Sequence, residues 1–192
     1  MDKILKSIKT PAYVCEEAKV RKNLELLKYV KEQSGAKILV ALKGFAFSGV
    51  MDMVGSYLDG ATCSGLHEAK FASEYVKGEI HTYSPAFKDE DFDEILKISK
   101  HITFNSFAQW QKFKGIALQN DIICGLRVNP EVSLAPTDSY NPCGKFSRLG
   151  ITRANFKPEL LDGITGLHFH ALCEESASSL QTVLEAFEEK FG

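Results

Sequence analysis

The chain is 192 residues long and 44% hydrophobic, which is enough to bury a substantial core and to form one domain. Its formal net charge of -2 gives no reason to expect nucleic acid or an anionic membrane as a partner. The N-terminus lacks the apolar segment of a signal peptide, and no apolar run approaches the length of about 20 residues that spans a bilayer. The 5 cysteines follow no CxxC or Cys/His ligand spacing, so we expect reduced thiols in a cytoplasmic protein.

The first part of the chain alternates between helical and extended patterns. Pro11 biases residues 10–14 away from helix, and we expect residues 1–15 to form an extended N-terminal segment. Apolar residues at helical spacing then predict a helix that ends at Ser34-Gly35. The five apolar residues 38–42 predict a short strand buried on both faces. A second helix, a strand over residues 60–63 and a third helix follow.

The same unit recurs through the rest of the chain. A strand over residues 80–83 precedes a helix whose first turn is acidic, as suits the N-terminal end of a helix dipole. A strand over residues 102–105 precedes a helix for which Ser106 is a suitable cap. The strands over residues 122–128 and 164–169 are separated by an irregular stretch, 129–147, which is long for a simple connection. A last helix runs through residues 180–187.

This alternation predicts an α/β fold. Strands start about every 20 residues with a helix between most pairs, which indicates parallel βα units with right-handed crossovers. A doubly wound open sheet and a barrel both fit, but no strand is followed by GxGxxG or GxxxxGKS/T, the phosphate-binding loops of doubly wound folds. A complete (β/α)8 TIM-type barrel needs eight units. We therefore expect residues 16–192 to form the N-terminal portion of such a barrel, with about six βα units.

Lys43 ends the first apolar strand and admits two interpretations. An ordinary lysine leaves the sheet there and extends its amine to water. A lysine at the C-terminal mouth of a barrel strand is instead partly buried, which lowers its pKa and leaves a nucleophilic amine able to form a Schiff base.

The other predicted strand ends also carry polar side chains. Catalytic groups of barrels sit at the C-terminal ends of the strands. A lysine, an arginine, two histidines and carboxylates around one mouth suit pyridoxal phosphate, although the pattern alone does not name that cofactor. These ends are Lys43, Ser64, Tyr83-Ser84, Asn105, residues 127–129 and residues 168–175.

Several motifs resemble one enzyme family. TPAYV at 10–14, the strand that ends at Lys43, RVNP at 127–130 and SRLG at 147–150 together resemble the alanine-racemase-like (fold-type III) pyridoxal-phosphate decarboxylases. HFH at 168–170 with LCE at 172–174, and CSGL at 63–66 with Glu68, are similar to the branch that converts carboxynorspermidine or carboxyspermidine to norspermidine or spermidine in polyamine biosynthesis. The resemblance covers nearly the whole chain.

The resemblance implies roles for four residues. Lys43 matches the lysine that binds pyridoxal 5'-phosphate as a Schiff base, and His170 matches the histidine that stacks on the pyridine ring. Arg127 matches an arginine near the cofactor at the end of the fifth strand. Cys173 stands where ornithine decarboxylases have a serine near the phosphate, although a thiol is a weaker donor than a hydroxyl. The alternatives are a hydrogen-bonded core histidine for His170 and a salt-bridged barrel residue for Arg127.

Some positions depart from the pattern of the ornithine and diaminopimelate decarboxylases. Ala61 and His67 stand where those enzymes have acidic residues, although Glu68 is adjacent to His67. These differences favour a separate branch. Glu174 and Glu175 are candidates for holding a polycationic substrate, and capping of the last helix explains them equally well.

The family's glycine-rich phosphate loop, its acid beside the pyridine nitrogen and its C-terminal β-domain find no counterpart in the sequence. We therefore expect a truncated part of the enzyme that is inactive alone, in which six strands leave open edges. The resemblance implies a small-molecule amino-acid or polyamine substrate, no nucleic acid or membrane partner, and a homodimer for the full-length enzyme. The alternatives are another fold-type III decarboxylase of the diaminopimelate or ornithine type, a non-catalytic pyridoxal-phosphate-binding protein, and an inert half-barrel without cofactor.

Overall fold

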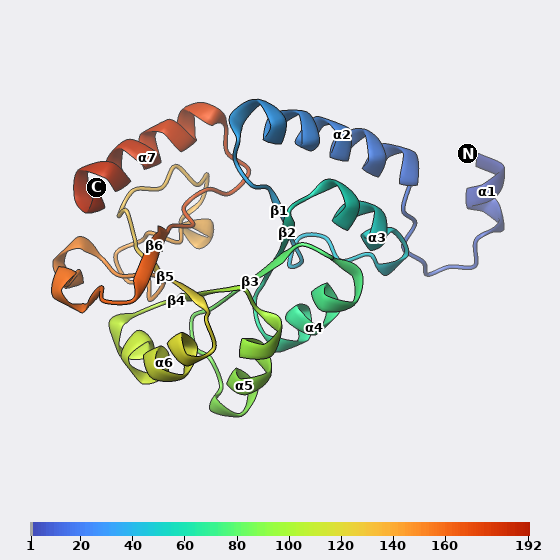
Figure 1. Ribbon diagram of the computed structural model, residues 1–192. Helices are drawn as coiled ribbons and strands as arrows, with labels where there is room; N and C mark the ends of the chain where they lie inside the picture. Colours follow the sequence, from blue (N-terminus) through green and yellow to red (C-terminus); the bar gives the residue numbers. More distant parts are fainter. Residues whose placement is uncertain (1) are drawn as a thin grey trace.

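The fold is built on one sheet of six parallel strands that lie in the order of the sequence, from β1 at one edge to β6 at the other. In the computed structural model, which describes residues 2–192, α3, α4, α5 and α6 lie one after another around the outside of these strands (Figure 1). The strands are β1 (Leu39–Ala41), β2 (Gly60–Cys63), β3 (Glu79–Ser84), β4 (His101–Phe104), β5 (Ile123–Arg127) and β6 (Ile164–His168).

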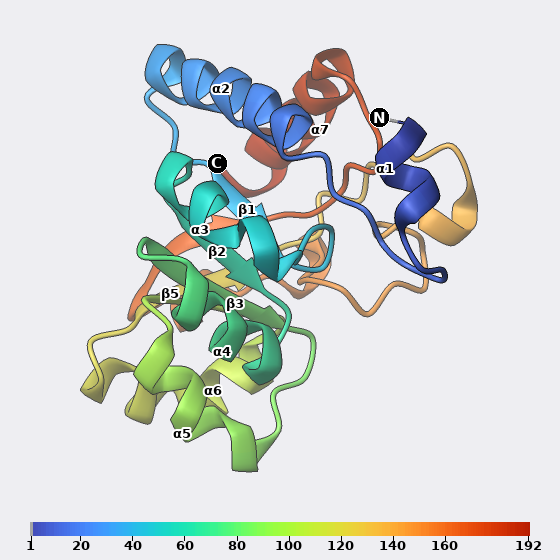
Figure 2. The same ribbon diagram turned by 90° about the vertical axis from the view of Figure 1, so that its right-hand side faces the viewer.

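Helices connect every pair of neighbouring strands from β1 to β5. The connection from β5 to β6 differs, because it contains only short 3-10 turns, and α7 follows β6. Figure 2 shows α2 and α7 together on one side of the strands, with α4, α5 and α6 on the other. The helices are α1 (Asp2–Ser7), α2 (Glu17–Ser34), α3 (Ser48–Tyr57), α4 (Leu66–Tyr75), α5 (Asp89–Ile98), α6 (Phe107–Gln119) and α7 (Ala177–Phe191), and the 3-10 turns are η1 (Asp138–Tyr140), η2 (Arg153–Asn155) and η3 (Pro158–Leu160).

The consecutive strand order distinguishes between the two α/β arrangements left open by the sequence. A doubly wound sheet reverses its strand order at a switch point, whereas a barrel adds each new strand beside the previous one. The sheet reverses nowhere in the described chain, so the predicted α/β class with barrel-type order is confirmed. Within the described residues, β1 and β6 each pair on one side only, as expected for an open set of six strands.

Alternate residues of each strand face opposite sides of the sheet. On β3, Ile80 and Thr82 are buried beneath the helices, where Ile80 joins the apolar core and Thr82 bonds to Ser99 across 2.8 Å. The residues between them, Glu79, His81 and Tyr83, are only partly buried and face the inside of the curve. The pleat thus separates an apolar outer layer from a polar inner surface.

Two apolar clusters hold the helices against the strands. One lies among α2, α3, α4 and the first strands and includes Met51, which is fully buried. The other lies among α5, α6, β4 and β5, where Trp110 is 1% exposed and the rings of Phe92 and Phe113 stack at 3.9 Å. The predicted cap of α6 is present, because the Ser106 hydroxyl accepts a hydrogen bond from the backbone N–H of Gln109.

Some predicted boundaries differ from the structure. Residues 1–15 were expected to be extended, but α1 covers Asp2–Ser7, and regular structure is missing only from residues 8 to 16. The strand expected over 38–42 is limited to β1, because the N–H groups of Gly44 and Phe45 bond back to the carbonyl of Ala41 and start a turn. None of the described helices is long and apolar enough to cross a membrane.

The start of β2 requires a glycine, because neighbouring backbones approach closely there. A Cβ added at Gly60 would lie 1.9 Å from the carbonyl oxygen of Glu79, so Gly60→Ala forces the β2 and β3 backbones apart. We expect it to lower the free energy of unfolding in urea by about 1–3 kcal/mol or more, the usual cost of overpacking.

The matched control is Gly115→Ala on the exposed face of α6, where a Cβ meets nothing within 4 Å. There alanine should raise the free energy of unfolding by up to about 1 kcal/mol, because glycine is a poor helix former. Equal stabilities for the two variants would show that the two strands are not held at the described distance.

Candidate active site

A cavity of about 430 Å³ lies at the carboxyl ends of the strands. Its volume falls in the range of small-molecule sites, about 300–1,000 Å³. All four residues named from the sequence as site candidates line it, although they come from parts of the chain up to 130 positions apart: Lys43, Arg127, His170 and Cys173. Tyr83, His168, Ser64, Tyr140 and Leu149 also line it.

Lys43 stands in the turn that ends β1. The preceding residue, Leu42, is buried, and its backbone N–H donates to the carbonyl of Thr62 at 3.2 Å. These contacts fix the position at which the turn begins. Lys43 itself is exposed, so the partial burial expected for it is wrong. The physical reason is the turn, which lifts the side chain out of the sheet and to the rim of the cavity. The amine is therefore accessible to a ligand there.

Arg127 is the buried cation of the cavity. The residue is 4% exposed, and within the described part of the chain no carboxylate lies within salt-bridge distance of its guanidinium, so a salt-bridged role for it is wrong. Nη1 donates to the hydroxyl of Tyr83 at 2.7 Å, Nη2 donates to the carbonyl of His170 at 3.3 Å, and the guanidinium carbon lies 4.9 Å from the centre of the Tyr83 ring. Nε is buried without a hydrogen-bond partner.

Asn105 connects this pair to the long loop that follows β5. Its Oδ1 accepts from the Tyr83 hydroxyl at 2.9 Å and from the N–H of Gly150 at 2.8 Å, while its Nδ2 donates to the carbonyl of Arg148 at 2.9 Å. Gly150 has a φ of 82°, and a Cβ there would lie 2.9 Å from the backbone of Val128. The end of the loop is therefore held beside β5 by hydrogen bonds from Asn105, the residue that follows β4.

The two histidines of β6 and its C-terminal extension differ in environment. His168 is partly buried and stacks on Tyr83 with ring centroids 5.7 Å apart. Burial, with the charge of Arg127 in second place, lowers the pKa of His168 to about 4. His170 is exposed at the rim, which shows that the core-histidine alternative is wrong. Desolvation in the cavity and then the charge of Lys43 lower the pKa of His170.

The pKa of Tyr83 changes in the opposite direction. Burial raises it, against the smaller lowering effect of Arg127. The phenol is therefore protonated at neutral pH, so it can donate to Asn105 while it accepts from Arg127.

Two acidic residues near the site make hydrogen bonds at the starts of helices. Glu68 accepts a hydrogen bond from the N–H of Ser64 at 2.7 Å and so closes the start of α4. Glu175 accepts from the hydroxyl of Ser179 at 2.7 Å, whereas the side-chain cap of α7 is Ser176, so the expected capping by the two acids is wrong. Neither Glu174 nor Glu175 lines the cavity, so the structure does not support them as contacts to a bound substrate.

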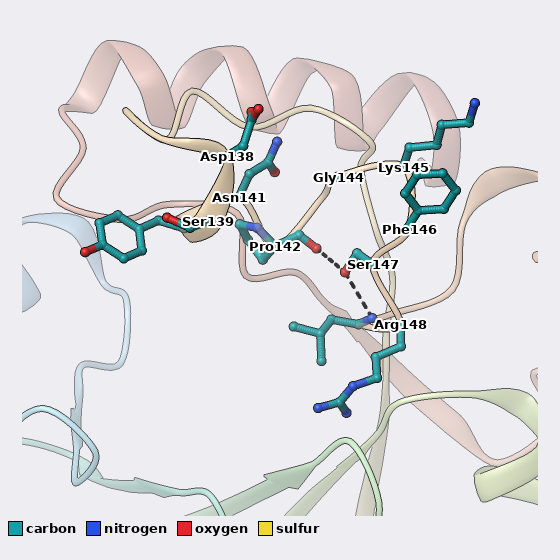
Figure 3. A pocket seen from close by; sticks show the side chains of 11 residues that line it. Asp138, Ser139, Asn141, Pro142, Gly144, Lys145, Phe146, Ser147 and Arg148 are labelled. Carbon is teal, nitrogen blue, oxygen red and sulfur yellow. Dashed lines mark hydrogen bonds between the residues drawn. The ribbon is translucent and has the colours of Figure 1, made fainter.

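The loop over residues 138–149 encloses a second, larger hollow of about 820 Å³. Figure 3 shows its lining residues in front of α7, with the Ser147 hydroxyl donating to the carbonyl of Pro142 at 2.6 Å and accepting from the N–H of Leu149. The hollow adjoins the first cavity, because Tyr140, Pro142 and Leu149 line both. The loop is thus one wall of the site at the strand ends.

Sequence reasoning identified Tyr83, Asn105 and His168 as strand-end residues but assigned no role to them. Their importance lies in contacts between strands: Tyr83 bonds to Asn105 and Arg127, 22 and 44 positions away, and its ring stacks on that of His168. In the sequence, their position at the ends of predicted strands was the signal that pointed to these residues. Which of them touch depends on how the strands pair.

Comparison with known proteins supports the resemblance. No family model matches the chain. It is 61% identical, over 96% of its length, to a carboxynorspermidine/carboxyspermidine decarboxylase of Campylobacter jejuni, and 37% identical to the enzyme of the same name from Herminiimonas arsenicoxydans. It is also 37% identical, over 98% of its length, to a carboxyaminopropylagmatine decarboxylase of Synechocystis. It covers 48%, 50% and 49% of these relatives, respectively.

Solved structures agree in fold. The crystal structure of carboxynorspermidine decarboxylase from Campylobacter jejuni in complex with norspermidine superposes with a TM-score of 0.88 at 57% identity, over 96% of this chain and 47% of that one. Diaminopimelate decarboxylase from Helicobacter pylori in complex with L-lysine superposes with a TM-score of 0.77 over 98% of this chain and 52% of that one. At 18% identity, the second likeness shows the fold alone.

The chain spans about half the length of the curated relatives it matches. Over that half, the resemblance predicted from its motifs is confirmed: the chain has the α/β fold of the N-terminal barrel of carboxynorspermidine/carboxyspermidine decarboxylases and is 61% identical to one of them.

Proposed function

We propose that the chain carries the cofactor-binding wall of a pyridoxal-phosphate-dependent decarboxylase that converts carboxynorspermidine or carboxyspermidine to norspermidine or spermidine. The observation that carries the proposal is the single cavity in which an exposed lysine amine, a buried arginine and two histidines meet at the carboxyl ends of barrel-type strands. The level of identity to the Campylobacter jejuni enzyme supports the choice of substrate.

The residues present fit the proposed cofactor. The lysine amine required for covalent attachment to an aldehyde is accessible at the rim, and the imidazole of His170 lies at the same rim. Arg127 presents a buried cation with an unpartnered Nε, and Lys43 adds a second basic group at the rim, which together suit an anionic ligand. When bound, pyridoxal phosphate supplies an electron sink for the carbanion left by loss of carbon dioxide.

The chain's own residues then have distinct tasks. Lys43 would hold the cofactor through its amine, and His170, at the same rim, would help to exclude water from it. Arg127 keeps its side chain in one position, because Tyr83 and the His170 carbonyl bind two of its nitrogens. Cys173 also lines the wall, where a weak thiol donor faces the ligand. His168 stays uncharged at neutral pH and so adds no second cation beside Arg127.

Substrate choice separates this proposal from its alternatives. Purified protein is assayed for carbon dioxide release from carboxynorspermidine, carboxyspermidine, diaminopimelate and ornithine. The assay uses the chain itself and any longer product of the same gene. We expect the longer product to turn over the carboxylated polyamines faster than the two amino acids, and the chain alone to show no turnover. Cofactor absorbance in the visible range without turnover by either protein would indicate a pyridoxal-phosphate carrier, and no cofactor absorbance would indicate an inert half-barrel. The homodimer and the cytoplasmic location stay predictions.

Reduction with borohydride tests the role of Lys43. In the cofactor-loaded protein it should fix the cofactor permanently on the peptide that contains Lys43, because that amine lies at the cavity rim. The label is located by mass spectrometry of a proteolytic digest. Lys37 is the internal control, since its amine is paired with Glu79 at 2.6 Å and lies outside the cavity. Label on Lys37 or on Lys145 would contradict the proposal.

His170→Ala tests whether the exposed imidazole contacts the cofactor. Loss of a ring–ring contact, which contributes about 0.5–1.5 kcal/mol, should weaken cofactor binding by about 2- to 10-fold and slow turnover with the fold retained. Cofactor titration by absorbance and circular dichroism measure the two properties. His67→Ala on the exposed surface of α4 is the matched control and should change neither. Unchanged affinity in His170→Ala would remove His170 from the site.

The depressed pKa of His168 makes stability depend on pH. The unfolded chain takes up a proton on this residue near pH 6.5, whereas the folded protein resists protonation until about pH 4. The unfolded state therefore binds more protons between these values, and the free energy of unfolding should fall as pH falls from about 6.5 to about 4.

His168→Gln should flatten this pH dependence, measured by urea unfolding at several pH values, because glutamine does not titrate. A direct check is the proton NMR titration of the His168 ring in the folded protein. An apparent pKa at or above 6.5 for that ring would contradict the described burial beside Arg127.

A further inference from the structure

A second group of titratable side chains faces the inside of the sheet, away from the cavity just described. Glu79 and His81 lie two residues apart on β3 and point to the same side, and His101 is the register partner of His81 on β4. Tyr83, which lines the strand-end cavity, is two residues further along β3, or about 7 Å. The group thus lies one layer deeper in the barrel interior.

The donor atoms of the three residues converge. Glu79 Oε2 lies 3.2 Å from His81 Nε2 and 3.6 Å from His101 Nε2, and all three atoms lie within 4.8 Å of one another. Two ligand atoms of a tetrahedral zinc ion are separated by about 3.3 Å, because each bond is about 2.0–2.1 Å long. The two distances from Oε2 bracket that value, and the strand register fixes the backbones that carry the residues.

The donor atoms also suit a cation. Imidazole nitrogens and carboxylate oxygens are ordinary ligands of Zn²⁺. Lys37 contacts Oε1 at 2.6 Å, so Oε2 is the oxygen left for a metal.

We propose that Glu79, His81 and His101 bind one Zn²⁺ ion inside the barrel, through one carboxylate oxygen and two imidazole nitrogens. Two histidines and one carboxylate form an established zinc ligand set that leaves the fourth position to water. A hollow of about 290 Å³ lined by both histidines gives room for that water. The ion cross-links β3 and β4 and so stabilises the interior layer beneath the strand-end cavity. This site stands independently of the proposed decarboxylase function.

Binding requires one local change. The two imidazole rings are stacked, with centroids 3.9 Å apart and planes inclined by 21°. A metal lies near the plane of each imidazole that binds it, so at least one ring has to turn about its Cβ–Cγ bond. If the proton of neutral His81 stands on Nε2, toward Glu79, it moves to Nδ1 in the same step, because Nε2 then binds the metal.

The site is tested by metal titration of the chain after removal of metal with a chelator. Co²⁺ serves as the spectroscopic probe and Zn²⁺ as the competitor, with proton NMR of the histidine rings as a second readout. We expect one Co²⁺ per chain, the visible bands of a four-coordinate site, displacement by Zn²⁺, and shifted ring signals of His81 and His101. His101→Gln should weaken binding by more than about 100-fold, since loss of a direct ligand exceeds the 10- to 100-fold effect of an outer partner.

Two controls separate this site from other donors. His67→Ala removes an exposed histidine of α4, and His170→Ala removes one from the strand-end cavity, so both variants should bind Co²⁺ like the original chain. Circular dichroism checks that His101→Gln is folded, and Glu79→Gln, which keeps the size of the side chain, repeats the test. Full affinity in both ligand variants would overturn the proposal. Intense thiolate absorbance, or absence of Co²⁺ binding with the three residues acting only as a hydrogen-bonded group, would overturn it as well.

Discussion

A buried guanidinium without a carboxylate partner is the constraint on which the strand-end cavity depends. Removing a charge from water costs several kcal/mol unless other groups replace its hydration. Around Arg127 these groups are the phenol oxygen and ring of Tyr83 and the carbonyl of His170. Burial is the main reason why the pKa of His168 is lowered to about 4, and the charge of Arg127, which is not neutralised, lowers it further. The cavity thus carries one buried positive charge, that of Arg127, and an exposed lysine amine at its rim.

Hydrogen bonds that cross the sheet hold that charge in place. The Tyr83 hydroxyl accepts a hydrogen bond from Arg127 and donates one to Asn105. Asn105 in turn bonds to the backbone of Arg148 and Gly150. Three strands and the end of a long irregular loop are therefore fixed relative to one another. The loop is also attached further back, where Ser133 donates to the carbonyl of Ala171. An irregular segment can form one wall of a ligand site here because hydrogen bonds hold it at both ends, through the Ser133 hydroxyl and through the backbone at Arg148 and Gly150.

The pleat of the strands gives the inner surface two chemical layers. Tyr83, Arg127 and His168 lie at the level of the strand ends, while Glu79, His81 and His101 lie deeper. The upper layer is cationic and open to a small molecule. The lower layer carries an ionised carboxylate between two neutral imidazoles. Since the strands are parallel and in consecutive register, residues two positions apart on one strand always contribute to successive layers.

The sequence by itself determined the elements and their class. Apolar runs, helical spacing and glycine stops predicted six strands and the helices between them, because these signals are local and depend on period alone. The motifs around Lys43, Arg127, His170 and Cys173 identified the decarboxylase branch, and these residues do meet in one cavity. The sequence did not predict α1, because the extended conformation that Pro11 favours was assigned to the whole of residues 1–15.

Only the tertiary structure decided which strand-end residues touch, and how deeply each lies. Lys43 was expected to be partly buried, but the turn formed on the Ala41 carbonyl places it in solvent at the rim. The chain from Tyr83 to Asn105 and Arg127, and the group of Glu79, His81 and His101, join residues about 20 to 44 positions apart. Such contacts depend on strand register and on which face of the pleat each side chain occupies. The sequence alone predicts neither the strand register nor the face of each side chain precisely enough to place a hydrogen bond or a metal ligand.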